Sequence, residues 1–146
     1  MGKILVPVDG SESAKNAADA AIEMAALMGD EIVALRVIDV ESYTGQWEFM
    51  RGQVEEELKR DAAEILDDIE KRAAAKRIKV EKIVRYGDAS NEIIAYVKEN
   101  RDVVRSIMMG AAGRRGLARA FVGSTASRVA RQVGAEVPCP VTIVPA

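Results

Sequence analysis

Apolar positions along the chain fall into two alternating kinds of segment. Short runs are rich in β-branched residues, and longer stretches repeat an apolar residue every three or four positions. The short runs predict five strands: Ile4 to Val8, Ile32 to Ile38, Val80 to Tyr86, Ile107 to Met109 with some preceding residues, and Val141 to Val144. This alternation predicts one α/β domain over 1–146, in which crossover helices connect the strands of a parallel sheet.

The longer stretches predict four helices. The first lies between the first two strands, with Ser11 as its N-cap and Gly29 as its stop. The other three are expected over Gln53 to Lys76, over Ser90 to Glu99, and from about Ser124 onward. The stretch from Glu41 to Gly52, which contains Trp47, has no clear period, and we expect it to be an exposed loop.

Composition excludes several classes of function. The 21 basic and 23 acidic residues give a net charge of −2, which offers no basic field for a nucleic acid. No run approaches the roughly 20 apolar residues that span a bilayer. The chain has no histidine and one cysteine, Cys139, so Ser-His triads, histidine-ligated zinc and intramolecular disulfides are excluded. We therefore expect a cytoplasmic protein without a nucleic-acid or membrane partner.

A glycine-rich segment between the fourth predicted strand and the last predicted helix carries the most specific chemistry. It contains Gly110, Gly113 and Gly123, followed by Ser124. At the carboxyl end of a parallel strand, a backbone without Cβ atoms can approach a phosphate, and a helix N-terminus adds free N–H donors. Arg114 and Arg115 can add cationic donors. The alternative interpretation is that the glycines only permit tight turns and that the arginines are solvated.

Two motifs at opposite ends of the chain resemble the universal stress protein family. They are the opening Ile4-Leu-Val-Pro-Val-Asp-Gly-Ser11 and the pattern Gly-x2-Gly-x9-Gly-Ser from Gly110 to Ser124. The resemblance continues to the closing segment Val137 to Val144 and so covers essentially the whole chain. It implies a Rossmann-like fold, an open five-stranded parallel sheet of order 3-2-1-4-5 with helices on both faces. Relatives with an intact glycine pattern bind ATP, usually with a divalent ion.

The resemblance also implies which residues contact the nucleotide. They are Pro7, Asp9, Val37, Met109, Gly110, Gly113, Gly123, Ser124 and Thr125, and the cationic side chain of Arg114 is a further candidate beside them. Asp9 is expected near the ribose or adenine, although an aspartate at a strand end can instead cap a helix. The backbone of Val37 is expected to recognise adenine, and Gly123 to have a backbone angle specific to glycine. We expect Mg²⁺ or Mn²⁺ to be held mainly by the phosphates, without dedicated metal ligands.

Four residues depart from the pattern of the family. Arg36 stands where many relatives have histidine, and Arg105 stands where an aspartate commonly opens the fourth strand. Ala111 and Ala112 replace more polar loop residues. Arg36 bears on the surroundings of the base and the two alanines on the phosphate contacts, whereas Arg105 bears on where the fourth strand begins.

Three functions remain in competition. The first is an ATP-binding regulator or sensor with little or slow hydrolysis and no assigned catalytic residue, since Asp9 is the only candidate base at a strand end. The second is a nucleotide-independent dimeric interaction module. The third, an ATP pyrophosphatase-like enzyme, expects a serine- and glycine-rich loop after the first strand, which residues 8–13 do not supply. The resemblance and the unpaired edge left by Val141 to Val144 also predict a homodimer through the last strand.

Overall fold

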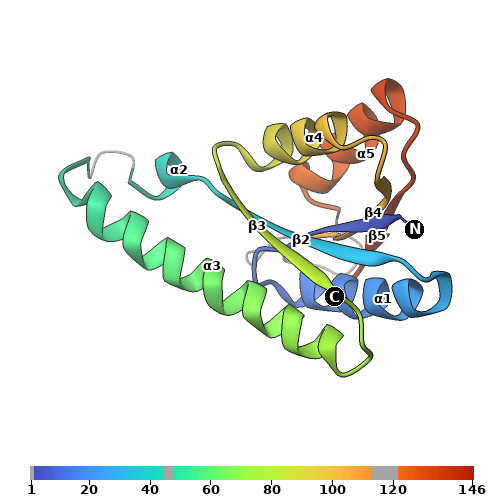
Figure 1. Ribbon diagram of the computed structural model, residues 1–146. Helices are drawn as coiled ribbons and strands as arrows, with labels where there is room; N and C mark the ends of the chain where they lie inside the picture. Colours follow the sequence, from blue (N-terminus) through green and yellow to red (C-terminus); the bar gives the residue numbers. More distant parts are fainter. Residues whose placement is uncertain (1, 45–47, 113–121) are drawn as a thin grey trace.

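A computed structural model describes residues 2–44, 48–112 and 122–146, with only the backbone described for residues 43, 44 and 48. In chain order, its elements are β1 (Lys3–Pro7), α1 (Glu12–Met28), β2 (Glu31–Ile38), α2 (Val40–Thr44), the 3-10 turn η1 (Glu48–Met50), α3 (Arg51–Ala74), β3 (Val80–Tyr86), α4 (Ala89–Glu99), β4 (Val104–Gly110), α5 (Ser124–Glu136) and β5 (Val141–Val144). Strands and helices alternate as the apolar pattern predicts (Figure 1).

The five strands form one parallel sheet in the order β3-β2-β1-β4-β5, which confirms the expected topology. Helices α1 and α3 cover one face of the sheet, and α4 and α5 cover the other (Figure 1). Each face has its own apolar core, because successive strand residues point to opposite sides. Leu5 and Leu35 belong to the α4–α5 core, whereas Ile4 and Ile32 belong to the α1–α3 core.

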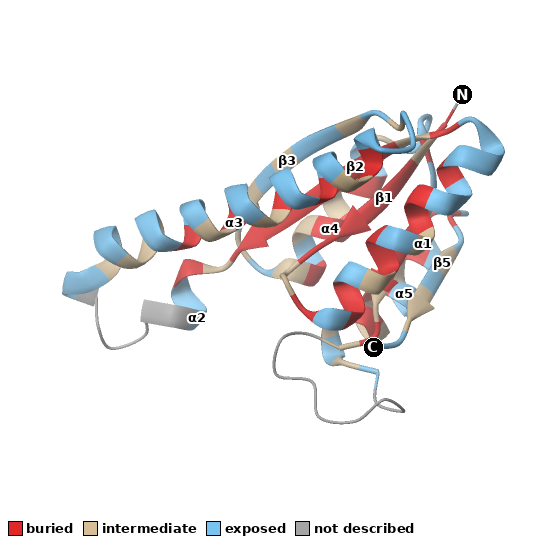
Figure 2. Cartoon of the chain, turned by 90° about the horizontal axis from the view of Figure 1, so that it is seen from below, coloured by how far each residue is buried: buried red, intermediate tan, exposed pale blue. Residues whose placement is uncertain are grey.

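Helix α1 has the two ends that the sequence predicts. The Oγ atom of Ser11 accepts a hydrogen bond from the N–H of Ala14, and Gly29 ends the helix in the left-handed conformation, with φ of 70°. Small side chains line its inner face, so the helix lies close to β1 and β4; Figure 2 shows this buried stripe along α1. The first turn of α1 is thereby held near the carboxyl ends of both strands.

The expectation of an exposed loop from Glu41 to Gly52 is wrong for the part that the structure describes. Residues Val40–Thr44 form α2, Glu48–Met50 form η1, and α3 begins at Arg51. The Asp39 carboxylate explains the first of these helices, because it accepts hydrogen bonds from the N–H and the Oγ of Ser42. Trp47 lies outside the described residues.

No helix in the described ranges is both long enough and apolar enough to cross a membrane.

Candidate functional site

A cavity of about 420 Å³ opens at the carboxyl ends of β1, β2 and β4, beside the N-terminus of α5. This is the edge of an open parallel sheet at which ligands bind. The predicted site residues among its lining are Pro7, Asp9, Val37, Met109, Gly110, Gly123, Ser124 and Thr125. Gly113 and Arg114, the other two predicted residues, lie outside the described residues. The structure therefore brings together all the predicted residues that it describes.

Asp9 lies in the turn between β1 and α1. Its Oδ1 atom accepts a hydrogen bond of 2.9 Å from the N–H of Ser11, while Ser11 is the N-cap of α1. Asp9 therefore stabilises the turn before α1, and the alternative in which Asp9 itself is the N-cap of the helix is wrong. Gly10, with φ of 83°, allows the chain to reverse here. The turn leaves the Asp9 carboxylate in the lining of the cavity.

Gly110 is required by the close approach of α1. A Cβ atom at Gly110 would contact the Ser13 side chain and lie 2.7 Å from the backbone nitrogen of Ala14. No side chain fits at that distance without movement of the backbone, so the last residue of β4 has to be glycine. The first turn of α1 and the start of the glycine segment consequently form one wall of the cavity.

At Gly123 the structure corrects the expected backbone angle. Gly123 is the N-cap of α5 with φ of −65°, a value open to every residue, so no glycine-specific conformation is needed. A Cβ atom there would instead lie 3.3 Å from the carbonyl oxygen of Ala111, which is a tight contact. Ser124 is the first helical residue and is exposed. The N–H groups of the first turn of α5 and the Ser124 hydroxyl are therefore available to an anion in the cavity.

The end of β2 forms the opposite side of the cavity. Leu35, Arg36 and Val37 line it there, and Ile93 of α4 adds an apolar side chain. Nη1 of Arg36 donates a hydrogen bond of 2.7 Å to the carbonyl oxygen of Val37. In the sequence, Arg36 stood out only because many members of the family have histidine at its position. The place of Ile93 in the cavity lining was not predicted, because the spacing of Ile93 is that of an ordinary core residue of a helix.

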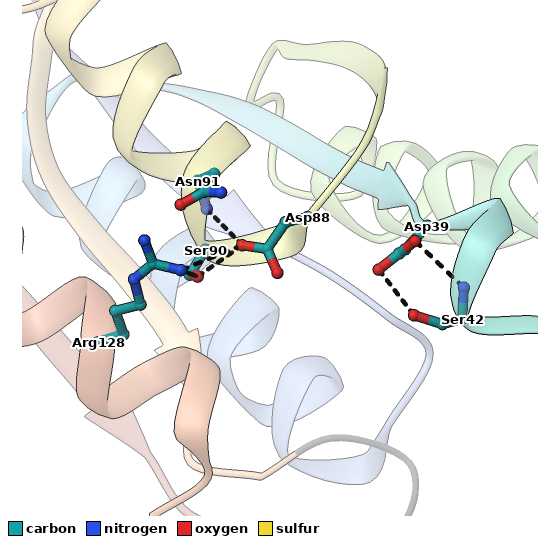
Figure 3. Close-up of polar contacts among 6 residues, drawn as sticks. All are labelled: Asp39, Ser42, Asp88, Ser90, Asn91 and Arg128. Atoms are coloured by element: carbon teal, nitrogen blue, oxygen red, sulfur yellow. Dashed lines mark hydrogen bonds and ion pairs between the residues drawn. The ribbon is translucent and has the colours of Figure 1, made fainter.

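The start of α4 is fixed beside the cavity by a polar cluster (Figure 3). Asp88 caps the helix by accepting a hydrogen bond of 3.0 Å from the N–H of Asn91, and Arg128 of α5 lies 3.4 Å from the same carboxylate. The hydrogen bond from Asn91, assisted by one from the Ser90 hydroxyl and by the charge of Arg128, lowers the pKa of Asp88 below 3.8. This cluster holds Ala89 at the cavity wall.

The described residues offer little to a metal ion by themselves. They contain no group of three or more His, Cys, Asp or Glu side chains able to hold one. Asp9 is the one carboxylate among the described lining residues. A hard cation prefers several oxygen ligands, so it fits this cavity only if the ligand supplies most of them.

The chain belongs to the universal stress protein family, whose model matches residues 1–145. It is 32% identical over 147 residues to universal stress protein MJ0531 of Methanocaldococcus jannaschii, covering 97% of this chain and 81% of that protein. Its fold is similar to that of universal stress protein UspA from Lactobacillus plantarum, with a TM-score of 0.80, 28% identity, and coverage of 98% and 97% of the two chains.

Two more distant structures of the family contain nucleotides. A universal stress protein in complex with cAMP has a TM-score of 0.67 and 21% identity, with 98% and 95% of the chains covered. One from Archaeoglobus fulgidus in complex with dAMP has a TM-score of 0.65 and 17% identity, with 99% and 98% covered. At these identities the likeness to this chain is one of fold.

Proposed function

We propose that this protein binds ATP in the cavity and acts as a regulator or sensor with little or slow hydrolysis. The observation that carries the proposal is the division of the cavity between two chemistries. One end has the free N–H groups of α5 and the backbone at Gly110, and the other has the apolar side chains of Val37 and Ile93. Such a division suits a ligand with a polyanionic end and a flat apolar end.

The phosphates belong at the α5 end under this proposal. The N-terminus of α5 carries a partial positive charge, and the N–H groups of its first turn are directed toward an anion placed there. Ser124 and Thr125 supply hydroxyl groups at the same end. Complexes of distant relatives with cAMP and dAMP support an adenine nucleotide as the ligand class. Mg²⁺ or Mn²⁺ would then be held mainly by phosphate oxygens, and Asp9 is the residue that could add one ligand.

Slow turnover is proposed because the described lining provides one candidate base. Hydrolysis needs a positioned water and a group that accepts its proton. One oxygen of the Asp9 carboxylate already accepts the N–H of Ser11, which ties this group to the turn. A sensor that keeps its nucleotide fits this arrangement better than an efficient ATPase.

We also propose that two copies pair through β5. This strand is hydrogen-bonded to β4 alone among the described strands, so one row of its backbone groups faces outward. A second copy related by a two-fold axis would satisfy that row. The cytoplasmic location expected from the sequence remains a prediction.

Protein stripped of carried-over ligand and titrated calorimetrically with ATP, with and without Mg²⁺, tests the nucleotide proposal. The expected result is saturable binding at one ATP per chain. Mass spectrometry of small molecules released from gently purified protein provides a second measurement, and an adenine nucleotide should be found. Absence of ATP binding in the folded, stripped protein would favour the nucleotide-independent interaction module instead.

A further inference from the structure

The side chain of Arg36 is a buried cation with few partners. Arg36 is 8% exposed, and no carboxylate among the described residues lies within ion-pair distance of it. Its Nη1 donates to the carbonyl oxygen of Val37, while Nε is buried without a hydrogen-bond partner. A buried guanidinium without acceptors is costly. A ligand in the adjoining cavity that offers acceptors would lower this cost.

The carbonyl that Arg36 occupies lies at the base end of the proposed nucleotide site. The carbonyl oxygen of Leu35 accepts the N–H of Val8, and the pairing of β1 with β2 ends at Pro7 and Leu35. The Val37 carbonyl points to the same side of β2, two residues farther along, beyond the end of that pairing. It is therefore open toward the cavity, on the side opposite the N-terminus of α5.

The two common purine types present opposite chemistry at such a position. Adenine carries a 6-amino group, a donor, which needs an acceptor such as a free backbone carbonyl. A 6-oxopurine presents O6 and N7, two acceptors on one edge, and arginine is the side chain that matches this pair in two hydrogen bonds. The Val37 carbonyl keeps a second lone pair, but a 6-amino group that used it would have to lie beside the cationic N–H groups of Arg36.

We propose that Arg36 is a specificity-determining residue that makes the site favour 6-oxopurine nucleotides over adenine nucleotides. The inference rests on the proposed nucleotide site and widens its ligand class to purine nucleoside triphosphates. Nη1 occupies the acceptor that adenine would use. Nε is buried, so the partners for O6 and N7 are the second N–H of Nη1 and the N–H groups of Nη2.

Inosine triphosphate and ATP are the appropriate probes, because their bases differ at position 6 and in the proton at N1. Calorimetric titration of the stripped wild-type protein with each nucleotide is expected to give a tighter Kd for inosine triphosphate than for ATP. A Kd for ATP equal to or tighter than that for inosine triphosphate would overturn the role of Arg36 and leave the nucleotide site intact. Binding of neither nucleotide would overturn the site and the inference together.

Substitution of Arg36 provides the second measurement. Arg36→Gln removes the charge and the fork, and Arg36→Met keeps the length of the side chain without donors. In either variant, the ratio of the two Kd values should move toward ATP by about fivefold or more, which is about 1 kcal/mol. Arg101→Gln, an exposed arginine far along the chain, is the matched control and should leave the ratio unchanged. If a folded Arg36 variant keeps the wild-type ratio of the Kd values for inosine triphosphate and ATP, the proposal is contradicted. If neither variant folds, the ratio measured on the wild-type protein decides alone.

Discussion

Ser13 and Ala112 exchange two hydrogen bonds across 99 residues of sequence: the Ser13 hydroxyl donates to the carbonyl of Ala112, and its Oγ accepts the Ala112 N–H at 3.3 Å. Ser13 lies in the first turn of α1, and Ala112 follows β4 at the start of the glycine segment. These bonds fix the beginning of the proposed phosphate-binding backbone to the buried face of α1. Ser13 is a positioning residue, because it is absent from the cavity lining.

Ser13→Ala should therefore weaken ATP binding while the protein remains folded. Loss of the two bonds should reduce the free energy of unfolding by about 1 kcal/mol, and the ATP Kd should rise about threefold or more. Calorimetry and urea unfolding measure the two effects. Ser106→Ala, in β4, is the control that removes a hydroxyl without a hydrogen bond to any other residue in the described part of the chain. Unchanged ATP affinity in Ser13→Ala would mean that the position of Ala112 does not matter for binding.

Features that depend on neighbouring residues could be predicted from the sequence, whereas contacts between distant segments could not. Ser11 and Gly29 predicted both ends of α1 because capping depends on adjacent backbone geometry. The edge of the sheet at which the cavity lies followed from the alternation of strands and helices. The Ser13–Ala112 bonds could not be predicted, since they depend on how closely α1 approaches β4. The bend of the Arg36 side chain toward Val37 likewise depends on the three-dimensional packing around it.

In the region after β2, the sequence pattern failed to predict a helix that the structure contains. A short helix such as α2 has too few residues to display an apolar period, so residues 41–52 looked like a loop. Its signal was the Asp39–Ser42 pair, a capping contact that resembles ordinary polar sequence until the backbone is known.

Asp88 should make stability depend on pH. Its pKa is lowered in the folded protein, so the unfolded chain binds more protons as the pH falls, and the stabilising contribution of the carboxylate is present above 3.8. That contribution is lost as the pH falls through the lower, folded-state pKa. Urea unfolding of wild type and Asp88→Asn from about pH 3 to about pH 7 should give a stability difference that is largest near neutrality and shrinks in acid. Because Asp88 is half exposed, the difference in unfolding free energy at neutral pH should stay below about 1 kcal/mol. A difference that does not change with pH would contradict this role.

The proposed dimer can be tested by placing proline on the two sides of β5. The carbonyls of Pro140 and Val144 accept N–H groups from β4 and the residue after it, so Thr142, between them, also faces β4. Ile143 therefore turns its N–H toward the open edge. Ile143→Pro should yield monomers that keep the wild-type circular dichroism, because it removes an edge donor.

Thr142→Pro is the matched variant and should destabilise the fold itself, because it removes a donor from the β4–β5 ladder. Sedimentation velocity distinguishes the states of assembly. A wild-type protein that is monomeric at high concentration, or an Ile143→Pro variant that remains dimeric, would rule out pairing through the β5 edge.

Gly123 and Ser124 provide the most direct test of the phosphate end. Gly123→Val should raise the ATP Kd by about tenfold or more, a change of about 1.4 kcal/mol. The added Cβ would press on the Ala111 carbonyl and so displace the glycine segment or the first turn of α5. Since Gly123 has an ordinary φ, the cost in folding arises from this contact and from the poor capping by valine, about 1 kcal/mol, rather than from a forbidden backbone angle.

The gentler companion is Ser124→Ala. The side chain of Ser124 does not cap α5, so its loss should leave the unfolding free energy within about 0.5 kcal/mol of wild type and reduce only ATP affinity. This separation makes the pair informative: Gly123→Val changes the shape of the site, and Ser124→Ala removes one hydroxyl from an unchanged shape. Titration calorimetry on variants with a cooperative melt gives the comparison. If both folded variants bind ATP as tightly as the parent, phosphates do not occupy the N-terminus of α5, and the interaction-module alternative becomes the better account of the cavity.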